Sequence, residues 1–154
     1  MQRLIRKLKP EDLIPITEIE QRAFTNPWPA EAFYGPYFEY SRILELEGKL
    51  CGYIFFHVIM DEAVILNFAI DPAKQGQGHG KYLLVESLKE LNQSGCTHFY
   101  LDVRESNETA IKLYEKQGFC ALGRRKHYYS NPDEDAIMMG LVYEPGRNNH
   151  DPRI

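Results

Sequence analysis

Hydrophobic positions follow two different spacings along this chain, and each spacing predicts one kind of element. Alternation over residues 3–8 predicts a first strand. After Pro10, two acidic residues precede a run with an apolar side chain at about every third or fourth position, which predicts a helix beginning at Pro10. The apolar stripe of this helix consists of Leu13, Ile16, Ile19 and Ala23. The prolines around Trp28 end this region, and Ala30–Tyr34 is expected to form one short helix.

The middle of the chain predicts three strands joined by tight turns. Residues 43–46 and 50–59 are rich in apolar side chains, and Glu47-Gly48-Lys49 between them is typical of a hairpin turn. A second turn at Asp61-Glu62 leads to a third strand over residues 63–70. We therefore expect an antiparallel meander in this region.

The second half of the chain alternates between helical and strand spacing. The predicted elements are a helix over 78–92, a strand over 97–103, a helix over 107–117 and closing strands over 119–122 and 136–142. Gly118 ends the second of these helices, and the stretch between the closing strands has no clear period. This order predicts the α/β (α+β) class, with a mixed sheet flanked by helices.

Length and composition favour one globular domain. The chain has 154 residues, of which 44% are hydrophobic and 26% charged, and both fractions are close to globular averages. We expect a single domain over residues 1–143 and a flexible tail over 144–154, which is polar and contains two prolines. No apolar run approaches the roughly 18 residues of a membrane-spanning helix, and the first residues do not resemble a secretory signal.

Charge and cysteine usage narrow the class of protein further. A net charge of −4 argues against a protein that coats nucleic acid. Cys51, Cys96 and Cys120 are an odd number of thiols without C-x-x-C spacing, so neither a disulfide framework nor a zinc cluster is expected. We therefore expect a reducing, cytoplasmic location and buried, inert thiols. The basic run Arg124-Arg125-Lys126 is expected to be a solvated or loop-facing set of charges.

The most informative stretch is a glycine-rich loop over residues 71–81, between a predicted strand and a predicted helix. Its alternating glycines are Gly76, Gly78 and Gly80. Glycine lets successive backbone N–H groups point the same way, and the start of a helix adds partial positive charge. Such a loop suits a phosphate or pyrophosphate group, although a flexible strand-to-helix connector can have the same composition.

Two common nucleotide-binding motifs do not match this loop. The P-loop requires glycine where the chain has Gln75, and serine or threonine where it has Tyr82. The dinucleotide fingerprint requires glycine where the chain has Lys81 or Leu83. Both motifs are therefore excluded.

A different pattern, Q/R-x-x-G-x-G/A, matches the loop at Gln75, Gly78 and Gly80. A second block over residues 99–119 contains V-R-x-S-N-x-x-A-I-x-L-Y-x-x-x-G-F. Together these blocks resemble the GNAT N-acetyltransferase superfamily. The resemblance implies a mostly antiparallel mixed sheet of about seven strands with about four helices, splayed between strands 4 and 5, with the cosubstrate acetyl-coenzyme A (acetyl-CoA) in the splay.

Further segments narrow the resemblance to one branch of the superfamily. The chain resembles the RimI-type enzymes at residues 19–24, at Pro27-Trp28, at Asp61-Glu62-Ala63, and at Tyr128-Tyr129 followed by residues 134–139. Those enzymes acetylate the N-terminal alanine of a small-subunit ribosomal protein. This implies direct transfer from acetyl-CoA to a peptide N-terminal α-amine, without a metal, nucleic acid or membrane as partner. The segments around Trp28 and Tyr128-Tyr129 are expected to recognise the acceptor. Trp28 between its two prolines also suits packing as a helix staple, and the resemblance favours the peptide groove.

The resemblance also implies which residues bind the donor. Backbone groups of one strand end would hold the pantetheine arm, and backbone N–H groups of the loop would hold the pyrophosphate. The strand end is Phe68, Ala69 and Ile70, and the loop residues are Gly76, Gln77, Gly78, His79, Gly80 and Lys81. The His79 side chain is expected to face solvent, and Lys81 either adds charge or is simply solvated. Asn107 is expected to cap the following helix, and in the family its side chain also bonds coenzyme A.

Two side chains are the catalytic candidates. The resemblance makes Tyr114 the acid that protonates the departing thiolate, although tyrosine at this helical spacing is also typical of core packing. Asp102 occupies the position of a glutamate base in RimI-type enzymes. Strand alternation places Asp102 on a polar face with His98 and Tyr100. Because aspartate is one methylene shorter than glutamate, three possibilities stay open: direct action, action through water, or no role as the base.

Two other functions stay open at this point. An enzyme of the same fold can acetylate a lysine side chain or a small amine instead of a peptide N-terminus. A protein that kept the loop and lost turnover would be a non-catalytic sensor of coenzyme A. An acetyl-cysteine intermediate is disfavoured, because no cysteine belongs to a recognisable Cys/His arrangement.

Overall fold

The computed structural model describes residues 2–33 and 39–144, so the predicted tail lies outside the described residues from position 145 onward. Contacts within the chain divide it into two units. Unit 1 comprises Met1–His57 and Leu66–Glu90, and unit 2 comprises Val58–Ile65 and Leu91–Ile154. The single domain over residues 1–143 stays a prediction. Within the described residues, no helix is long and apolar enough to cross a membrane.

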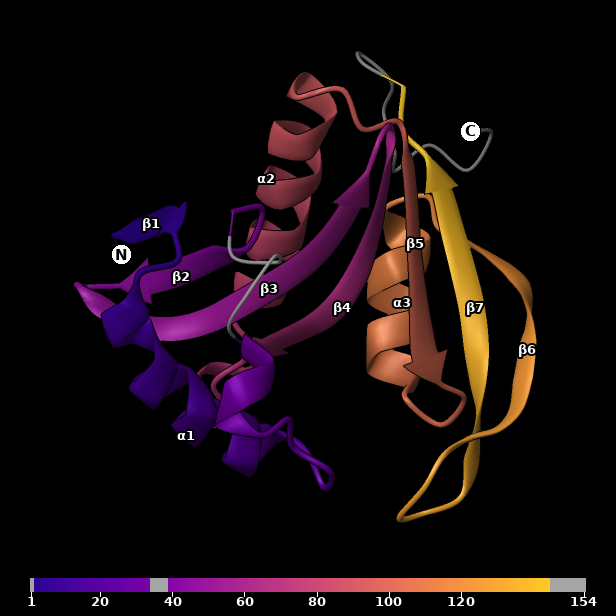
Figure 1. Ribbon diagram of the computed structural model, residues 1–154, viewed down its shortest axis with the longest axis horizontal. Coiled ribbons are helices and arrows are strands. Elements are labelled where there is room, and N and C mark those ends of the chain that lie inside the picture. Colours follow the sequence, from indigo (N-terminus) through magenta and orange to yellow (C-terminus); the bar gives the residue numbers. More distant parts are fainter. Residues whose placement is uncertain (1, 34–38, 145–154) are drawn as a thin grey trace. The chain divides into compact units, whose positions relative to one another are not determined.

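Seven strands and three α-helices account for most of the described residues (Figure 1). In chain order they are β1 (Arg3–Lys7), α1 (Leu13–Ala23), β2 (Arg42–Leu46), β3 (Lys49–Ile59), β4 (Glu62–Ile70), α2 (His79–Gln93), β5 (His98–Arg104), α3 (Glu108–Lys116), β6 (Cys120–Tyr129) and β7 (Glu134–Val142). Short 3-10 helices are η1 (Pro10–Asp12), η2 (Ala30–Phe33) and η3 (Pro72–Lys74).

The strands form one mixed sheet in the order β1-β2-β3-β4-β5-β7-β6. β4 and β5 pair in parallel, and their partners lie at the start of both strands: Glu62 with His98, Ala63 with Phe99 and Val64 with Tyr100. The pairs β1–β2, β2–β3, β5–β7 and β6–β7 are antiparallel. The mixed, mostly antiparallel sheet expected from the sequence is confirmed.

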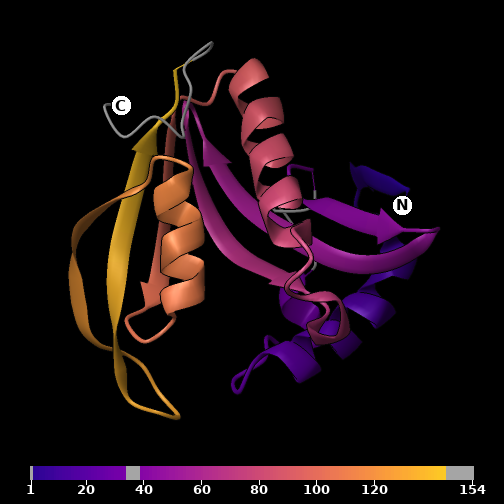
Figure 2. The ribbon, with the colours of Figure 1, turned by 180° about the vertical axis from the view of Figure 1, so that it is seen from behind.

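In unit 1, α1 and α2 cover opposite faces of β2 and β3, as Figures 1 and 2 show. The predicted stripe of α1 faces the sheet, where Ile16 and Ile19 are buried in a cluster with Tyr53 and Phe55. Phe56 points to the other face of β3 by strand alternation and is also buried. Because both faces of β3 are covered, its sequence is a nearly continuous apolar run.

In unit 2, α3 packs on one face of the β5 and β7 pair (Figure 2). β5 alternates strictly between buried and half-buried side chains. Its buried residues are Phe99, Leu101 and Val103, and its half-buried residues are His98, Tyr100, Asp102 and Arg104. This is the alternation predicted from the sequence, and it leaves Asp102 on the polar face.

Two helical predictions differ from the structure. The helix expected to begin at Pro10 starts as the 3-10 turn η1, and α1 begins only at Leu13. The short helix expected over Ala30–Tyr34 is the 3-10 helix η2, which ends at Phe33, and Tyr34 lies outside the described residues. The described residues therefore contain three α-helices, whereas about four helices were expected.

The largest difference concerns β6. Only residues 119–122 were predicted as a strand, yet β6 spans Cys120–Tyr129. Its first nine side chains are exposed, so neither face imposes an apolar alternation on the sequence. Its pairing with β7 also shifts register between Ala121 and Gly123 and between Arg125 and Tyr129, which disrupts any period of two.

Candidate active site

The glycine-rich loop in unit 1 is anchored to the strand that precedes it. The Asp71 carboxylate accepts a hydrogen bond from the Ala73 N–H, with 3.1 Å between Oδ1 and N. The side-chain Nε2 of Gln75 donates to the carbonyl oxygen of Ile70 at 3.1 Å. Gln75 therefore folds the loop back onto the end of β4, which explains why the motif begins with a side chain that can donate a hydrogen bond.

The loop requires glycine at two positions and offers a row of donors. Gly76 and Gly78 have φ angles of +79° and +82°, in the left-handed region that side chains disfavour. The first backbone bond of α2 runs from the Tyr82 N–H to the Gly78 carbonyl oxygen at 3.1 Å. In the described part of the chain, the N–H groups from Gly76 to Lys81 have no acceptor among the backbone bonds. These donors at a helix start fit a pyrophosphate group.

His79 contradicts its prediction. Its side chain was expected to face solvent, but it is only 1% exposed. Neither ring nitrogen has a hydrogen-bond partner among the described residues. Burial lowers the pKa of the imidazole, and the positive charges of Arg3 and Lys74 lower it further. The prediction was wrong because the packing of α2 on its sheet, not the local sequence, decides whether the first residue of that helix points inward.

Arg3 is a basic residue beside the loop that the sequence did not indicate. Its guanidinium carbon lies 4.7 Å from the centre of the Tyr82 ring. Its Nη2 lies 4.0 Å from the position that a Cβ would take on Gly78. Residues so distant in sequence share no local pattern, so no sequence signal was available. Gln77 and Lys81, which were predicted, are exposed.

The strand end predicted to hold the pantetheine arm is supported by β3. Ala69 and Ile70 are buried. A Cβ on Gly52 would lie 2.6 Å from Cδ1 of Ile70 and 3.0 Å from the carbonyl oxygen of Ala69, so glycine is needed for this close approach. The Asp71 N–H donates to the Cys51 carbonyl oxygen at 2.7 Å. The contact of this strand end with the donor stays a prediction.

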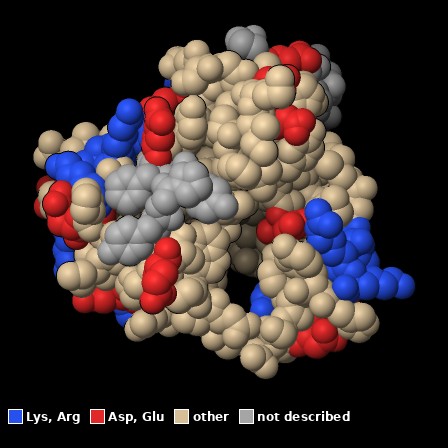
Figure 3. Space-filling model, viewed as in Figure 1, with Lys and Arg blue, Asp and Glu red and all other residues tan. Residues whose placement is uncertain are grey.

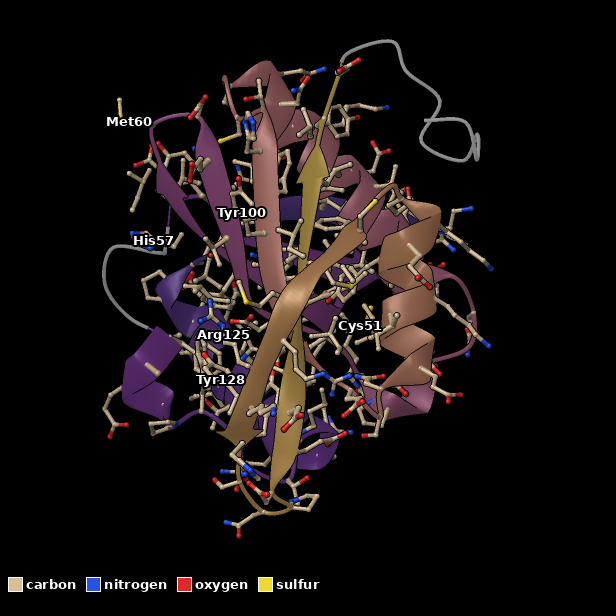
Figure 4. All side chains as sticks on the ribbon, turned by 90° about the vertical axis from the view of Figure 1, so that its right-hand side faces the viewer. Cys51, His57, Met60, Tyr100, Arg125 and Tyr128 are labelled. Atoms are coloured by element: carbon tan, nitrogen blue, oxygen red, sulfur yellow. The ribbon has the colours of Figure 1, made fainter. Side chains whose placement is uncertain are left out.

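In unit 2, the Asp102 carboxylate is already engaged. Its Oδ1 lies 3.1 Å from the Nε of Arg125, which comes from β6. The two side chains are 26% and 47% exposed, so solvent reaches the pair. The guanidinium carbon of Arg125 also lies 5.7 Å from the centre of the Tyr128 ring, and Figure 4 labels both residues along β6. The sequence did not predict this partner of the candidate base.

Tyr114 and Tyr129 share one electrostatic environment with Asp102. Tyr114 is buried in unit 2, and its ring packs against Phe119 with 5.6 Å between centroids. Burial raises the pKa of Tyr114, and Tyr129 raises it further. Burial, followed by the charge of Asp102, raises the pKa of Tyr129 to about 12. Both phenols are therefore protonated at neutral pH. Tyr129 lies within electrostatic reach of both catalytic candidates, although the sequence assigned it only to acceptor recognition.

Asn107 caps α3, as its residue type suggests. Its Oδ1 accepts a hydrogen bond from the Ala110 N–H at 3.2 Å. The turn before the cap is held by Glu134, whose carboxylate accepts from the Ser106 N–H at 2.6 Å and pairs with Arg104 at 3.1 Å. The additional contact of Asn107 with coenzyme A stays a prediction.

Trp28 packs against the aromatic cluster of unit 1. Its ring centroid lies 5.2 Å from that of Phe33 and 6.2 Å from that of Phe55. The indole is half-buried. The side chain therefore packs against the core, while its role in acceptor recognition stays a prediction.

The cysteines agree only in part with expectation. Cys51 and Cys96 are buried, and burial raises the pKa of the Cys51 thiol to about 11. Cys120 is exposed, which corrects the expectation that all three thiols are buried. The reason is that Cys120 begins β6, where nearly every side chain is exposed.

The basic run lies on the strand β6 rather than in a loop. Arg124 pairs with Glu105 at 2.7 Å and with Asp135 at 3.1 Å, so two carboxylates offset its charge. Figure 3 shows Lys and Arg mixed with Asp and Glu on the visible face. Among the described residues, no group of three or more His, Cys, Asp or Glu is placed to hold a metal ion.

The comparisons with known proteins agree with this geometry. The [ribosomal protein bS18]-alanine N-acetyltransferase of Escherichia coli strain K12 is 39% identical over 141 residues, which are 89% of this chain and 95% of that protein. The crystal structure of the ribosomal-protein-S18-alanine N-acetyltransferase from Escherichia coli superposes with a TM-score of 0.86 at 37% identity, covering 96% of this chain and 98% of the other.

A more distant solved structure has the same fold. Ard1 from Thermoplasma volcanium gives a TM-score of 0.86 at 26% identity, covering 94% of this chain and 100% of the other. The sequence profile of the Acetyltransferase (GNAT) family matches residues 13–119, which include the glycine-rich loop and the α3 block. This chain therefore belongs to the GNAT acetyltransferase family.

Proposed function

We propose that this chain transfers the acetyl group of acetyl-CoA to the N-terminal alanine of the ribosomal protein bS18, in the cytoplasm. The observation that carries the proposal is the 39% identity to the Escherichia coli enzyme of that name, which extends over 95% of that enzyme. The matched region covers 89% of this chain, so it spans the segment around Trp28 and the Tyr128-Tyr129 pair, where we expect the acceptor to bind. In the loop, Gly76 and Gly78 have positive φ angles, and the N–H groups from Gly76 to Lys81 have no backbone acceptor among the described residues. Both features support acetyl-CoA as the donor.

The donor is assigned to groups of unit 1. Backbone N–H groups from Gly76 to Lys81 bind the pyrophosphate, and Arg3 adds positive charge beside them. Backbone groups of Phe68, Ala69 and Ile70 bind the pantetheine arm in the manner of an added strand. The backbone contacts need no particular side chain, so the strand and loop conformations alone can provide them, and only the charge of Arg3 depends on a side chain.

The transfer is assigned to two side chains of unit 2. A peptide α-amine has an ordinary pKa of about 7.7–8.0, so much of it is neutral near pH 7.5 and its nitrogen can attack the thioester carbonyl. As the N–C bond forms and the C–S bond breaks, Asp102 accepts the surplus amine proton directly or through water. Tyr114 donates its phenolic proton to the departing thiolate. The raised pKa of Tyr114 keeps that proton available at neutral pH.

The proposal is tested by thiol release from acetyl-CoA with short peptides that differ only in the first residue. One peptide carries the bS18 N-terminal sequence, and the others replace its alanine with serine, glycine or valine. A peptide with a blocked N-terminus and an internal lysine, together with spermidine, covers the other amines. Turnover on the free alanine peptide above all others is the expected result. Turnover mainly on lysine or spermidine would overturn the proposed acceptor and keep the donor.

A further inference from the structure

One buried carboxylate in unit 1 accepts hydrogen bonds from three neutral donors and has no cationic partner among the described residues. Glu20, on α1, is only 1% exposed. Its Oε1 accepts hydrogen bonds from the Tyr53 hydroxyl at 2.6 Å and from Nδ2 of Asn67 at 2.9 Å. Its Oε2 accepts from the backbone N–H of Trp28 at 3.0 Å. The donors come from β3, from β4 and from the segment that follows α1.

Burying such a carboxylate in the core costs free energy. Moving a charged group out of water costs several kcal/mol, which hydrogen bonds from neutral donors offset only in part. An apolar residue would pack at Glu20 without that cost. Burial and the charge of Glu20 raise the pKa of Tyr53, so its hydroxyl stays a donor. The gain from this network is therefore the fixed geometry of the groups it joins.

The backbone N–H of Trp28 is one of the groups that the Glu20 network joins, and Trp28 lies between two prolines. Proline has no N–H, so within Pro27-Trp28-Pro29 only Trp28 can donate from the backbone. Glu20 accepts that one hydrogen bond. The Trp28 indole rests on Phe33 and Phe55, and Phe24 nearby in sequence is 38% exposed. The segment is thus fixed at one backbone point while part of its apolar surface stays exposed.

The other end of the network lies beside the strand end proposed to hold the donor. Asn67 directly precedes Phe68–Ile70, and Asp71 directly follows it. Asp71 pairs with Arg22 of α1, with 3.0 Å from Nη1 to Oδ1 and 3.3 Å from Nη2 to Oδ2. Two residues of α1, Glu20 and Arg22, therefore bind the chain immediately before and immediately after this strand end.

From this arrangement we propose that Glu20 is a positioning residue for the acceptor. Its carboxylate holds the Trp28 segment in register with the strand end that binds the donor, and so determines where the acceptor α-amine stands relative to the thioester. This inference rests on the proposed function, because it takes the Trp28 segment as part of the acceptor site. Because Glu20 is buried, it acts through the groups that it binds, of which Trp28 and Asn67 connect it to the two proposed binding segments.

The test compares Glu20→Gln with Glu18→Gln. Glutamine has nearly the shape of glutamate, but its amide NH₂ faces donors instead of accepting from them. Glu18 is an exposed residue of the same helix and receives the same chemical change. For Glu20→Gln we expect kcat/KM for the alanine peptide to fall about tenfold to a hundredfold, since small misplacements of reacting groups have effects of that size. The KM for acetyl-CoA stays within about twofold, and Glu18→Gln behaves as wild type.

Fluorescence gives an independent readout, because Trp28 is the only tryptophan of the chain. In Glu20→Gln, loss of the hydrogen bond from the backbone N–H of Trp28 shifts the indole emission to longer wavelength. In a titration followed by that emission, the alanine peptide binds more weakly than to wild type. Glu18→Gln keeps the wild-type emission. A Glu20→Gln protein with a lower melting temperature but unchanged peptide KM and emission would overturn the proposal, since its role would then be stability alone.

Tyr53→Phe covers the case in which Glu20→Gln does not fold. This variant removes one donor from Oε1 and leaves the Trp28 bond in place, and we expect a smaller rise of the peptide KM with an unchanged KM for acetyl-CoA. Equal effects on both KM values would overturn the positioning role. If the wild-type enzyme acetylates another amine instead of the alanine peptide, the proposed function fails. The ratio of kcat/KM in Glu20→Gln to kcat/KM in wild type, measured with that amine, then still decides the role of Glu20.

Discussion

The Nε of Arg125 lies 3.1 Å from Oδ1 of Asp102, so a guanidinium from β6 binds the carboxylate that we propose as the base. Among the described residues, the second oxygen of Asp102 has no hydrogen-bond partner, so it remains available to an amine or to a water molecule. A base held in this way has a fixed orientation. This matters because aspartate is one methylene shorter than the glutamate that the family resemblance implies at this position.

Asp102→Ala should therefore lower the rate in a pH-dependent manner. We expect kcat/KM for the peptide to fall about tenfold to a hundredfold at pH 6.5, because no side chain then accepts the surplus proton of the attacking amine. The loss should shrink as the pH rises towards 9, because hydroxide can then accept that proton in place of Asp102. Rates of thiol release measured from pH 6.5 to 9 provide the check. A ratio to wild type that does not change with pH would contradict a role as the base.

Arg125→Gln is the companion variant, since Arg125 is the ion-pair partner of Asp102. Its rate should lie between those of wild type and Asp102→Ala. The ion pair is partly exposed, so its removal should change the free energy of unfolding by no more than about 1 kcal/mol. Urea denaturation and the same rate assay measure both effects. A larger rate loss than in Asp102→Ala would show that Arg125 has a separate role.

Tyr114→Phe should remove the acid and keep the packing. The ring contact with Phe119 does not need the hydroxyl, so we expect the variant to fold with this contact in place and the KM for acetyl-CoA to stay close to wild type. We expect kcat to fall about a hundredfold, within the usual range for a lost proton donor. Because the pKa of Tyr114 is raised, the wild-type rate should show no decline from its ionisation below pH 9. An unchanged kcat in Tyr114→Phe would reassign Tyr114 to core packing alone.

His79→Leu should stabilise the protein, because both ring nitrogens of His79 are buried without a partner among the described residues. Removing unsatisfied polar atoms of this kind is expected to raise the free energy of unfolding by about 1–3 kcal/mol. Urea denaturation at pH 8 measures this difference. A variant less stable than wild type would show that His79 has a favourable partner, such as a bound water.

The pH dependence of that difference follows from the lowered pKa of His79. In the unfolded chain the imidazole has a pKa of about 6.5, so below this pH the unfolded state binds a proton that the buried ring does not bind. The contribution of His79 to stability therefore becomes more unfavourable as the pH falls from 7.5 to 5.5. The advantage of His79→Leu over wild type should grow over the same range, and a constant difference would contradict the lowered pKa.

Two substitutions of Asn107 separate its cap from the predicted contact with the donor. Asn107→Ala removes the bond to the Ala110 N–H and should lower the free energy of unfolding by about 1 kcal/mol, whereas serine is itself a good cap and should preserve it. Neither side chain carries the amide, so both should raise the KM for acetyl-CoA. A normal KM in the serine variant would leave Asn107 as a helix cap only.

Features that depend on neighbours in sequence were predictable here. The alternation of β5 placed Asp102 on the polar face, and Asn107 was expected as the cap of α3 because its residue type satisfies the free N–H groups of a helix start. The glycine pattern indicated the loop, and Gly76 and Gly78 indeed have positive φ. β6 could not be predicted in the same way, because exposed side chains on both of its faces impose no period.

The sequence by itself thus determined the order and type of most elements, the loop and the family, since these follow from local spacing and from motifs. Only the tertiary structure decided which distant groups meet. Glu20 bonds Tyr53 and Asn67, which lie 33 and 47 residues further on, and Arg125 reaches Asp102 across 23 residues. The burial of His79 depends likewise on the packing of α2. Such contacts depend on strand register and helix docking, and a shift of one residue would reverse which face each strand side chain occupies.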